Sequence, residues 1–443
     1  MENVTFPGEI LKKIRRTLKF RQHEIVGGEI TRNLVSIIEN NKASLTRDTA
    51  NILVANLNRL CRERNIDLIL EIRDLFTAGR FEAKQKAAEY TQVLEEKLLT
   101  KEDMEKYLEE VNLFFGEWDL PDEKANIYGR VADHFDAKFD YEKSYLYHIK
   151  AFESAIRLSN PTIIVECLAK LMAVCIRTGR YKETIEYGNF ANIYRQEVAD
   201  KLFVRILYNG ALADMYLSQY EIAIEKIQEI EGFIEEKQLT KYLDLMILKA
   251  ICYKRDNNYE KAQDIYQDLI PQLKDGMVEN KAMILTNMLE IYCLLGETSK
   301  VVTQIDELMP LLKQVEGKSL YLSQIKLEIG RAYHYLEKYD LAEKYLYEAL
   351  EYGKRLQDYG SIKKSIDCLT DMQLSRDEHA AKLACIDRLK GEVLSLISNK
   401  MIDFHSKSIL RIMTYYNNLN RSQELDDILR AFYQVKGDEG LYV

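Results

Sequence analysis

The chain has 443 residues, 47% of them apolar, and its five prolines and 19 glycines are too few for an all-β or linker-rich protein. This length exceeds one simple hydrophobic core, so repeats that each contact only their neighbours fit it better. The net charge of −9 is uneven, because residues 1–64 hold 12 Lys/Arg and 7 Asp/Glu and the remainder therefore carries −14, which favours nucleic acid as a partner of the basic end only.

Apolar residues at helical spacing predict four helices in residues 1–64. We expect them at about Gly8–Lys19, Arg21–Val26, Arg32–Glu39 and Arg47–Arg64. The residues expected to face inward are Leu11, Ile14, Leu18, Val35, Ile38, Leu53, Val54, Leu57 and Leu60. Thr31 is the expected N-cap of the third helix, and Asn41 can end that helix in a left-handed turn.

The segments Gln22–Val26 and Ile30–Lys42 resemble the helix-turn-helix of the phage-repressor (XRE) class. That class shows Q-x-x-L-A, a Ser/Thr-Arg start to the recognition helix, and I-x-x-I-E-x-G-K. Here Asn41 replaces the usual Gly, and the span from Gln22 to Glu39 is one residue shorter than the common pattern. The resemblance implies a DNA-binding head over residues 1–64.

Arg32, Asn33 and Ser36 are expected on the face of the recognition helix that enters a major groove. Arg pairs bidentately with guanine and Asn with adenine, each contact contributing roughly 1–3 kcal/mol of discrimination. The predicted phosphate contacts are Gln22, Arg15, Arg16 and Lys42. Glu39 is predicted to be structural. The alternative is a solvated helical domain whose basic residues only keep it soluble.

No linker rich in Gly, Pro or Ser follows the head, and Gly79-Arg80 is the first break in the helical pattern. Residues 65–120, which hold the only tryptophan, Trp118, are predicted to form a helical linker or atypical hairpin. A clearer pattern lies in Gly330–Leu350, where Gly, Tyr, Tyr, Ala and Ala follow at steps of 3, 6, 3 and 7. This spacing resembles the tetratricopeptide repeat (TPR), in which small residues let two antiparallel helices approach and large rings fill the space beside them.

The same template recurs along residues 121–443. Its eight first-helix approach positions are Ala132, Met172, Ala211, Ala250, Leu289, Gly330, Leu369 and Met413. They recur every 39 to 44 residues, which predicts about eight hairpins with helices longer than in the usual repeat of about 34. The expected fold is all-α: a helix-turn-helix domain followed by a TPR-like, right-handed solenoid.

The concave face of such a solenoid is built from the first helices, where polar residues are more frequent than a core permits. The candidate peptide contacts are Asn209, Asn287, Arg205, Lys170, Arg177, Tyr216, Asp244, Arg255, Arg331 and His334. A carboxamide both donates and accepts, which suits an extended peptide backbone, and arginine suits a carboxylate. The alternative is that these residues make hydrogen bonds between repeats or are solvated.

Catalytic and cofactor motifs do not occur in the sequence. The six histidines never pair as H-x-x-x-H, and there is no P-loop, G-x-S-x-G or G-x-G-x-x-G. We therefore predict no enzyme, no metal and no cofactor. Seven scattered cysteines without C-x-x-C indicate reduced thiols in a cytoplasmic protein, and we expect neither a secretory signal nor a membrane span.

An XRE-type head on repeats of about 40 residues resembles the peptide-responsive regulators of Gram-positive bacteria, the RRNPP family (Rap, Rgg, NprR, PlcR and PrgX). The double glycine Gly27-Gly28 and the length are similar to the clostridial RstA-type branch, which regulates sporulation and toxin expression. The resemblance implies a quorum-sensing transcription regulator, homodimeric through its repeats, that binds double-stranded DNA at an inverted-repeat operator. A short signalling peptide on the concave face, clamped by Asn209 and Asn287, would alter the dimer. The alternatives are a Rap-like protein that sequesters a response regulator and a constitutive scaffold.

Overall fold

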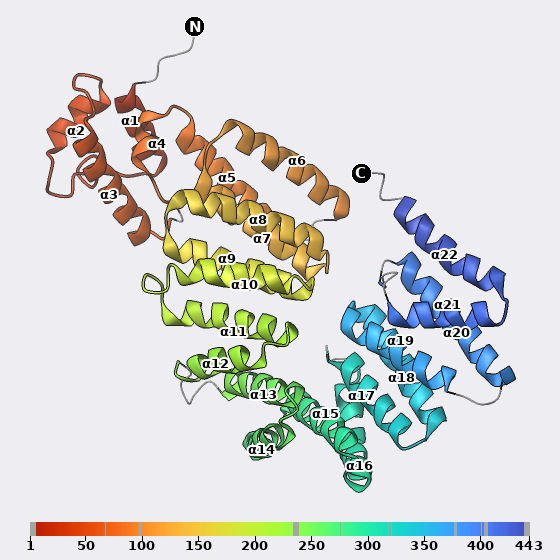
Figure 1. The fold of residues 1–443 in the computed structure, drawn as a ribbon. Helices are drawn as coiled ribbons and strands as arrows, with labels where there is room; N and C mark the ends of the chain where they lie inside the picture. The colour runs from red at the N-terminus through yellow and green to blue at the C-terminus, as the bar shows by residue number, and fades with distance from the viewer. Residues whose placement is uncertain are drawn as a thin grey trace. The chain divides into compact units, whose positions relative to one another are not determined.

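The computed structural model describes the chain except for residues 1–5, 67, 97–99, 234–238, 275, 318, 320, 376–378, 400, 403–405 and 438–443. The described residues form 22 α-helices and one short 3-10 helix, without a β-strand, so the predicted all-α fold is confirmed (Figure 1). The chain divides into two compact units, unit 1 over residues 1–209 and unit 2 over residues 210–443.

The head of unit 1 contains three of the four predicted helices. They are α1 (Pro7–Thr17), α2 (Arg32–Glu39) and α3 (Arg47–Glu63), and each lies within two residues of its predicted bounds. All nine residues predicted to face inward are buried. The same apolar core continues through Leu70, Leu75 and Phe81, past residue 64, where the sequence pattern places the end of the head.

The helix predicted over Arg21–Val26 is wrong, because residues 22–29 form consecutive turns. Gly27 and Gly28, which follow the predicted helix, have φ of 61° and 85°, so the turns continue past its expected end. Asn56 on α3 also donates to the carbonyl of Ile25 at 3.2 Å and packs where a Cβ on Gly27 would lie. Ile25 is nevertheless fully buried, so the segment still anchors the head through its apolar side chain.

Residues 68–120 join the head to the repeats through α4 (Ile72–Phe76), α5 (Arg80–Glu96) and α6 (Lys101–Glu117). Helices α5 and α6 are linked by Tyr107, whose hydroxyl donates to the carbonyl of Tyr90 at 3.1 Å. The indole of Trp118 covers Gly79, where a Cβ would lie 2.8 Å from the ring. Since Gly79 also has a φ of 78°, the turn into α5 requires glycine.

Eight helical hairpins follow, as the repeat period predicts. Their first helices are α7 (Pro121–Ala137), α9 (Pro161–Arg177), α11 (Asp200–Tyr216), α13 (Leu239–Arg255), α15 (Val278–Leu295), α17 (Leu322–Tyr335), α19 (Tyr359–Leu374) and α21 (Lys407–Asn418). Their second helices are α8 (Tyr141–Leu158), α10 (Tyr181–Asn192), α12 (Tyr220–Glu231), α14 (Tyr259–Leu269, followed by the 3-10 helix η1, Ile270–Gln272), α16 (Thr298–Val315), α18 (Tyr339–Leu356), α20 (His379–Ser398) and α22 (Ser422–Gly437). Every predicted approach position, from Ala132 to Met413, lies on a first helix. Unit 2 begins within α11.

The two helices of a hairpin are joined by a turn of constant geometry. In seven hairpins the residue two positions before the second helix has a left-handed φ. These residues are Phe139, Gly179, Ser218, Asn257, Gly296, Glu337 and Asn420. The next residue then donates its N–H to a carbonyl five residues earlier, as Lys338 does to Tyr333 at 2.9 Å. This bond satisfies a carbonyl that the end of the first helix leaves free and turns the chain back on itself.

Gly330 marks the closest approach of α17 and α18. A Cβ at this position would lie 2.8 Å from Cγ and 3.1 Å from the backbone nitrogen of Leu346. Gly391 on α20 is also helical, but a Cβ there would meet nothing within 4 Å. Glycine at position 330 is therefore required by the close approach of Leu346 and not by helix propensity.

Replacing Gly330 with alanine should destabilise unit 2. The added methyl must push α18 away from α17, and overpacking of this kind costs typically about 1–3 kcal/mol. The matched variant Gly391→Ala should stabilise slightly, by roughly 0.5–1 kcal/mol, because alanine restricts the unfolded chain at a site with free space. Urea midpoints followed by circular dichroism give both values. Equal midpoints for the two variants would contradict the close approach.

Candidate functional site

Helix α2 presents the face that the sequence predicts for base contacts. Thr31 Oγ1 accepts the N–H of Leu34 at 3.2 Å and caps the helix. Arg32 and Asn33 are exposed in its first turn, and Ser36 is half-buried one turn later. Asn41 has a φ of 56° and ends the helix as expected. A capped helix with Arg and Asn exposed at its N-terminal end has the geometry that major-groove reading requires.

Glu39 at the end of α2 ties the head together, as predicted. Its carboxylate is 1% exposed and accepts Nε of Arg15 at 2.5 Å, Nη2 of Arg15 at 2.8 Å and Nε2 of Gln22 at 2.8 Å. Burial by itself would raise the pKa of Glu39, but the hydrogen bonds and charge of Arg15 with the hydrogen bond of Gln22 outweigh it and hold that pKa below its ordinary value.

The hydrogen bonds to Glu39 involve two of the four residues predicted to contact DNA phosphates. Arg15 also donates through Nη1 to the carbonyl of Phe20 at 2.9 Å, so its guanidinium is engaged within the head. Gln22 is half-buried against Glu39. Arg16 and Lys42 are exposed. Of the four predicted phosphate contacts, Arg16 and Lys42 are therefore the exposed ones, while Arg15 and Gln22 bond to Glu39 of α2.

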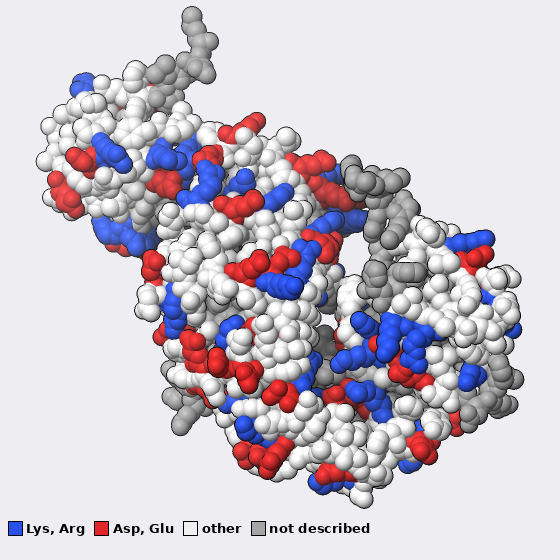
Figure 2. Space-filling model, in the orientation of Figure 1, with Lys and Arg blue, Asp and Glu red and all other residues white. Residues whose placement is uncertain are grey.

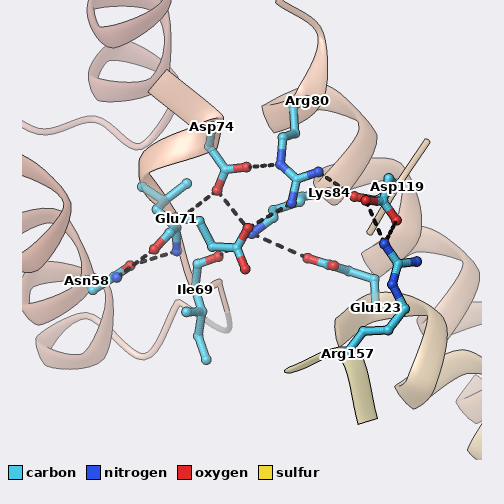
Figure 3. Close-up of polar contacts among 10 residues, drawn as sticks. Asn58, Ile69, Glu71, Asp74, Arg80, Lys84, Asp119, Glu123 and Arg157 are labelled. Carbon is cyan, nitrogen blue, oxygen red and sulfur yellow. Dashed lines mark hydrogen bonds and ion pairs between the residues drawn. The ribbon is translucent and has the colours of Figure 1, made fainter. Parts of the chain in front are cut away.

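A cluster of charged residues around the buried Asp74, Arg80 and Lys84, which the sequence does not reveal, joins the head to the repeats (Figure 3). The guanidinium of Arg80, 5% exposed, contacts Asp74 at 2.8 Å and Glu71 at 2.7 Å, and it donates to the carbonyl of Asp119. Lys84, 3% exposed, contacts Asp74 at 3.0 Å. We call these five residues the junction cluster. Sequence reasoning treats Arg80 as part of a break, because no linear pattern pairs it with residues on other helices.

The junction cluster is bonded to elements on both sides. Asn58 on α3 receives the N–H of Leu70 at 2.8 Å and donates to its carbonyl at 2.9 Å. On the repeat side, Lys84 lies 3.6 Å from Glu123 on α7, and Arg157 of α8 contacts Asp119 at 2.8 Å. Helices α3, α4, α5, α7 and α8 are thus connected through polar side chains within unit 1.

Three predicted peptide contacts in unit 1 bond instead to the preceding repeat. Lys170 on α9 contacts Asp133 on α7 at 2.6 Å, and Arg177 on α9 contacts Asp136 on α7. Asn209 on α11 donates to the carbonyl of Ala169 on α9 at 3.0 Å. Arg205 on α11 is exposed and has no ion pair or hydrogen bond to any described residue. The alternative of bonds between repeats therefore accounts for three of these four side chains.

In unit 2 a network of charges, which we call the inner network, links three successive first helices. Lys254 on α13 donates to Asn287 on α15 at 2.7 Å and also contacts Glu290 on α15. Arg331 on α17 lies 3.3 Å from Glu290 and 2.8 Å from Glu328 of its own helix. Asn287 is 2% exposed, and its amide also donates to the carbonyl of Met283 at 3.0 Å. A peptide reaching Asn287 would have to replace these bonds.

The pKa values of the two carboxylates of the inner network shift in opposite directions. Burial would raise the pKa of Glu290, but the adjacent Lys254 and Arg331 lower it to about 2. Burial raises the pKa of Glu328, and the nearby charge of Glu290 adds to that rise. Two carboxylates that share cations in a desolvated site separate their pKa values in this way.

The remaining predicted peptide contacts lie apart from the inner network. Arg255 lies over the ring of Tyr216, 5.4 Å from its centroid, and Asn280 donates to Asp244 at 3.4 Å. His334 packs against Tyr339, with ring centroids 5.9 Å apart. Figure 2 shows lysine and arginine side chains gathered over α18 and α19 of unit 2. Unit 2 therefore has a basic surface over α18 and α19. The predicted peptide contacts of this unit do not converge on one site.

Two further properties of the described residues concern metal binding and membrane insertion. No group of three His, Cys, Asp or Glu side chains in that part of the chain is arranged to hold a metal ion. Among the helices described, none is long and apolar enough to cross a membrane.

The repeat region matches a known family. Residues 118–305 match the family described as the SusR N-terminal TPR domain. The comparison with curated proteins returns no match. The family match therefore covers helices α7 to α15 and the part of α16 up to Ile305. It agrees with the hairpins seen in the structure.

Several solved structures are similar to this chain. The apo form of the quorum sensor NprR from B. thuringiensis is 17% identical, covers 81% of this chain and 99% of its own, and superposes with a TM-score of 0.51. A Rap protein complexed with competence and sporulation factor is 14% identical over 77% of this chain and 94% of its own (TM-score 0.43). Aspartyl phosphate phosphatase F from Bacillus subtilis is 15% identical over 80% and 96% (TM-score 0.45). The chain therefore has the TPR-like fold of NprR, and the resemblance to the RRNPP family is confirmed at the level of fold.

Breaking the inner network should destabilise unit 2 in a pH-dependent way. Lys254→Met removes the nearer cation from Glu290 and leaves it only Arg331 at 3.3 Å, and the loss of one partner of a buried ion pair costs about 3–5 kcal/mol. The pKa of Glu290 in the folded chain, about 2, lies below its ordinary value of 4.5, so its contribution is present above about pH 5 and is lost as the pH falls toward 2.

The measurement is urea unfolding of wild type and Lys254→Met at pH 7 and pH 3. The difference between them should be large at pH 7 and smaller at pH 3, where Glu290 of the variant is protonated. Lys300→Met is the matched control, since Lys300 pairs with Glu297 on an exposed surface. A pH-independent loss in Lys254→Met would mean that packing, and not charge, holds these helices.

Proposed function

We propose that this chain is a cytoplasmic, peptide-responsive DNA-binding regulator of the RRNPP family that acts as a homodimer through its repeats. The observation that carries the proposal is that one chain combines the exposed Arg32 and Asn33 of α2 with repeats of the NprR fold. The charge of the head, +5 against −14 for the remainder, supports DNA as the partner of the head. The finer similarity to RstA-type regulators of sporulation and toxin expression stays a prediction.

In the proposed DNA complex, Arg32, Asn33 and Ser36 read base edges while Arg16 and Lys42 contact phosphates. Arg15 and Gln22 hold Glu39 and so fix the orientation of α2. A dimer places two such helices on an inverted repeat, whose half-site spacing follows from the distance between the two heads.

In the proposed peptide complex, the ligand lies on the first helices of the repeats and competes with bonds between them. Arg205 and the partly exposed Arg331 are the cations available to a peptide carboxylate. Binding that replaces bonds of Asn209 or Asn287 would change the packing of successive first helices. A differential affinity of about 100-fold between two repeat geometries, roughly 2.7 kcal/mol, suffices for a switch.

The DNA-binding proposal is tested by selecting binding sites from a pool of randomised duplexes with the full-length chain. We expect an enriched inverted repeat whose affinity falls steeply with salt. Arg32→Ala should cost about 1–3 kcal/mol and relax specificity at one position, whereas Lys42→Ala should weaken all sequences equally and reduce the salt slope.

Arg59→Ala is the matched control, because Arg59 is an exposed arginine of the head that pairs with Glu63 on α3. It should leave binding unchanged. Failure to enrich any sequence, or an Arg32→Ala variant that binds like the wild type, would contradict the proposal. Capture of a response regulator by a chain that selects no DNA would favour the Rap-like alternative.

The peptide proposal is tested by native mass spectrometry of the chain incubated with short peptides from culture medium. Arg205→Ala should lower the affinity for a captured peptide at least tenfold. Because Arg205 has no bonded partner among the described residues, the substitution removes no contact between repeats. The double variant Asn209→Ala, Asn287→Ala should also weaken it if these amides clamp the peptide backbone. Unchanged affinity in the double variant would show that the two amides serve only the repeats.

A further inference from the structure

Unit 1 contains a cavity of about 610 Å³ between the head and the first repeat. Its walls come from the start of α3, from α4 and α5, from the start of α7 and from the end of α8. A volume of this size lies within the usual range for small-molecule sites, about 300–1,000 Å³. The proposed DNA and peptide surfaces use none of its lining residues.

Four arginines and one carboxylate line the cavity, which gives its wall an excess of three positive charges. They are Arg47, Arg73, Arg80, Arg157 and Glu71. Arg80 is balanced by Glu71 and the buried Asp74, and Arg157 by Asp119 (Figure 3). Arg47 and Arg73 are exposed and have no ion pair or hydrogen bond to any residue in the described ranges. Two guanidiniums are therefore free to bind an anion.

The remaining lining residues are apolar. Phe76 is 42% exposed, and Ile72, Pro121 and Leu158 complete the lining around it. An exposed phenylalanine ring beside arginines offers a stacking surface for a planar group next to a site for a phosphate. A free inorganic anion would use the arginines but would leave this apolar wall in contact with water.

We propose that this cavity binds a nucleotide-sized organic phosphate, with the phosphates on Arg47 and Arg73 and the planar base against Phe76. Arginine forks bind phosphate oxygens bidentately, which gives both affinity and orientation. The buried Arg80 fixes the wall because its own partners hold it in place. Since α3 belongs to the head and α7 and α8 to the first repeat, the bound compound would brace one against the other. This inference does not depend on DNA binding.

The test is isothermal titration of the full-length chain with ADP, with inorganic pyrophosphate and with adenosine. ADP should bind, pyrophosphate should bind at least tenfold more weakly, and adenosine should not bind detectably. Arg73→Ala should weaken ADP at least tenfold, and Arg73→Lys should fall between the two, because lysine keeps the charge but loses the fork. Phe76→Ala should weaken ADP but not pyrophosphate. Arg59→Ala, an arginine of α3 outside the cavity, should not change ADP affinity.

Three results would overturn the proposal. They are the absence of ADP binding at millimolar concentration, equal affinity for adenosine, and equal affinity of wild type and Arg73→Ala. DNA affinity of the same variants separates this proposal from the function proposed above. If Arg47→Ala and Arg73→Ala weaken selected DNA while ADP does not bind, these arginines contact DNA phosphates and only the cavity proposal fails. If ADP binds and no DNA is selected, only the regulator proposal fails.

Discussion

Each hairpin of this chain has an apolar face that only its neighbour can bury, and this constraint determines most of what the repeats show. In unit 2 one continuous core runs from Leu243 to Tyr345, across successive hairpins, and a second runs from Leu327 to Ile428. Stacking of this kind tolerates variation in sequence but not in geometry, because each hairpin must close at the same angle. The left-handed turn that precedes seven of the second helices and the close approach at Gly330 fix that angle.

The polar residues of the first helices also contribute to the packing of one hairpin against the next. Lys170, Asn209 and Lys254 bond to the adjacent first helix, so the surface that would receive a peptide also stabilises the stacking of repeats. A ligand that replaces such a bond does not simply add a contact, because a buried carboxylate such as Glu290 must keep a partner. Binding and repeat packing are therefore linked energetically in the proposed mechanism. A rigid groove lined by free side chains would have no such linkage.

The period of the repeats and helix α2 could be predicted from sequence because both depend on local spacing. Ala132 to Met413 recur at nearly constant steps, and Thr31 caps α2 in the manner that its position indicates. The turns at residues 22–26 could not, since the apolar spacing around Ile25 matches a helix. The left-handed repeat turns are signalled by residue type at Gly179 and Gly296 but not at Phe139 and Glu337.

The partners of the polar side chains could not be predicted from the sequence, because they lie on other helices. Arg80 depends on Glu71, Asp74 and Asp119, and no spacing rule connects them. Removing the buried Asp74 would leave Arg80 and Lys84 with only Glu71 and Glu123 as carboxylate partners, so Asp74 holds α4 against α5. Asn58 extends the same connection to α3 through the backbone of Leu70. Short polar bonds therefore connect the first repeat with the head, and the cavity of the proposed ligand lies beside Arg80.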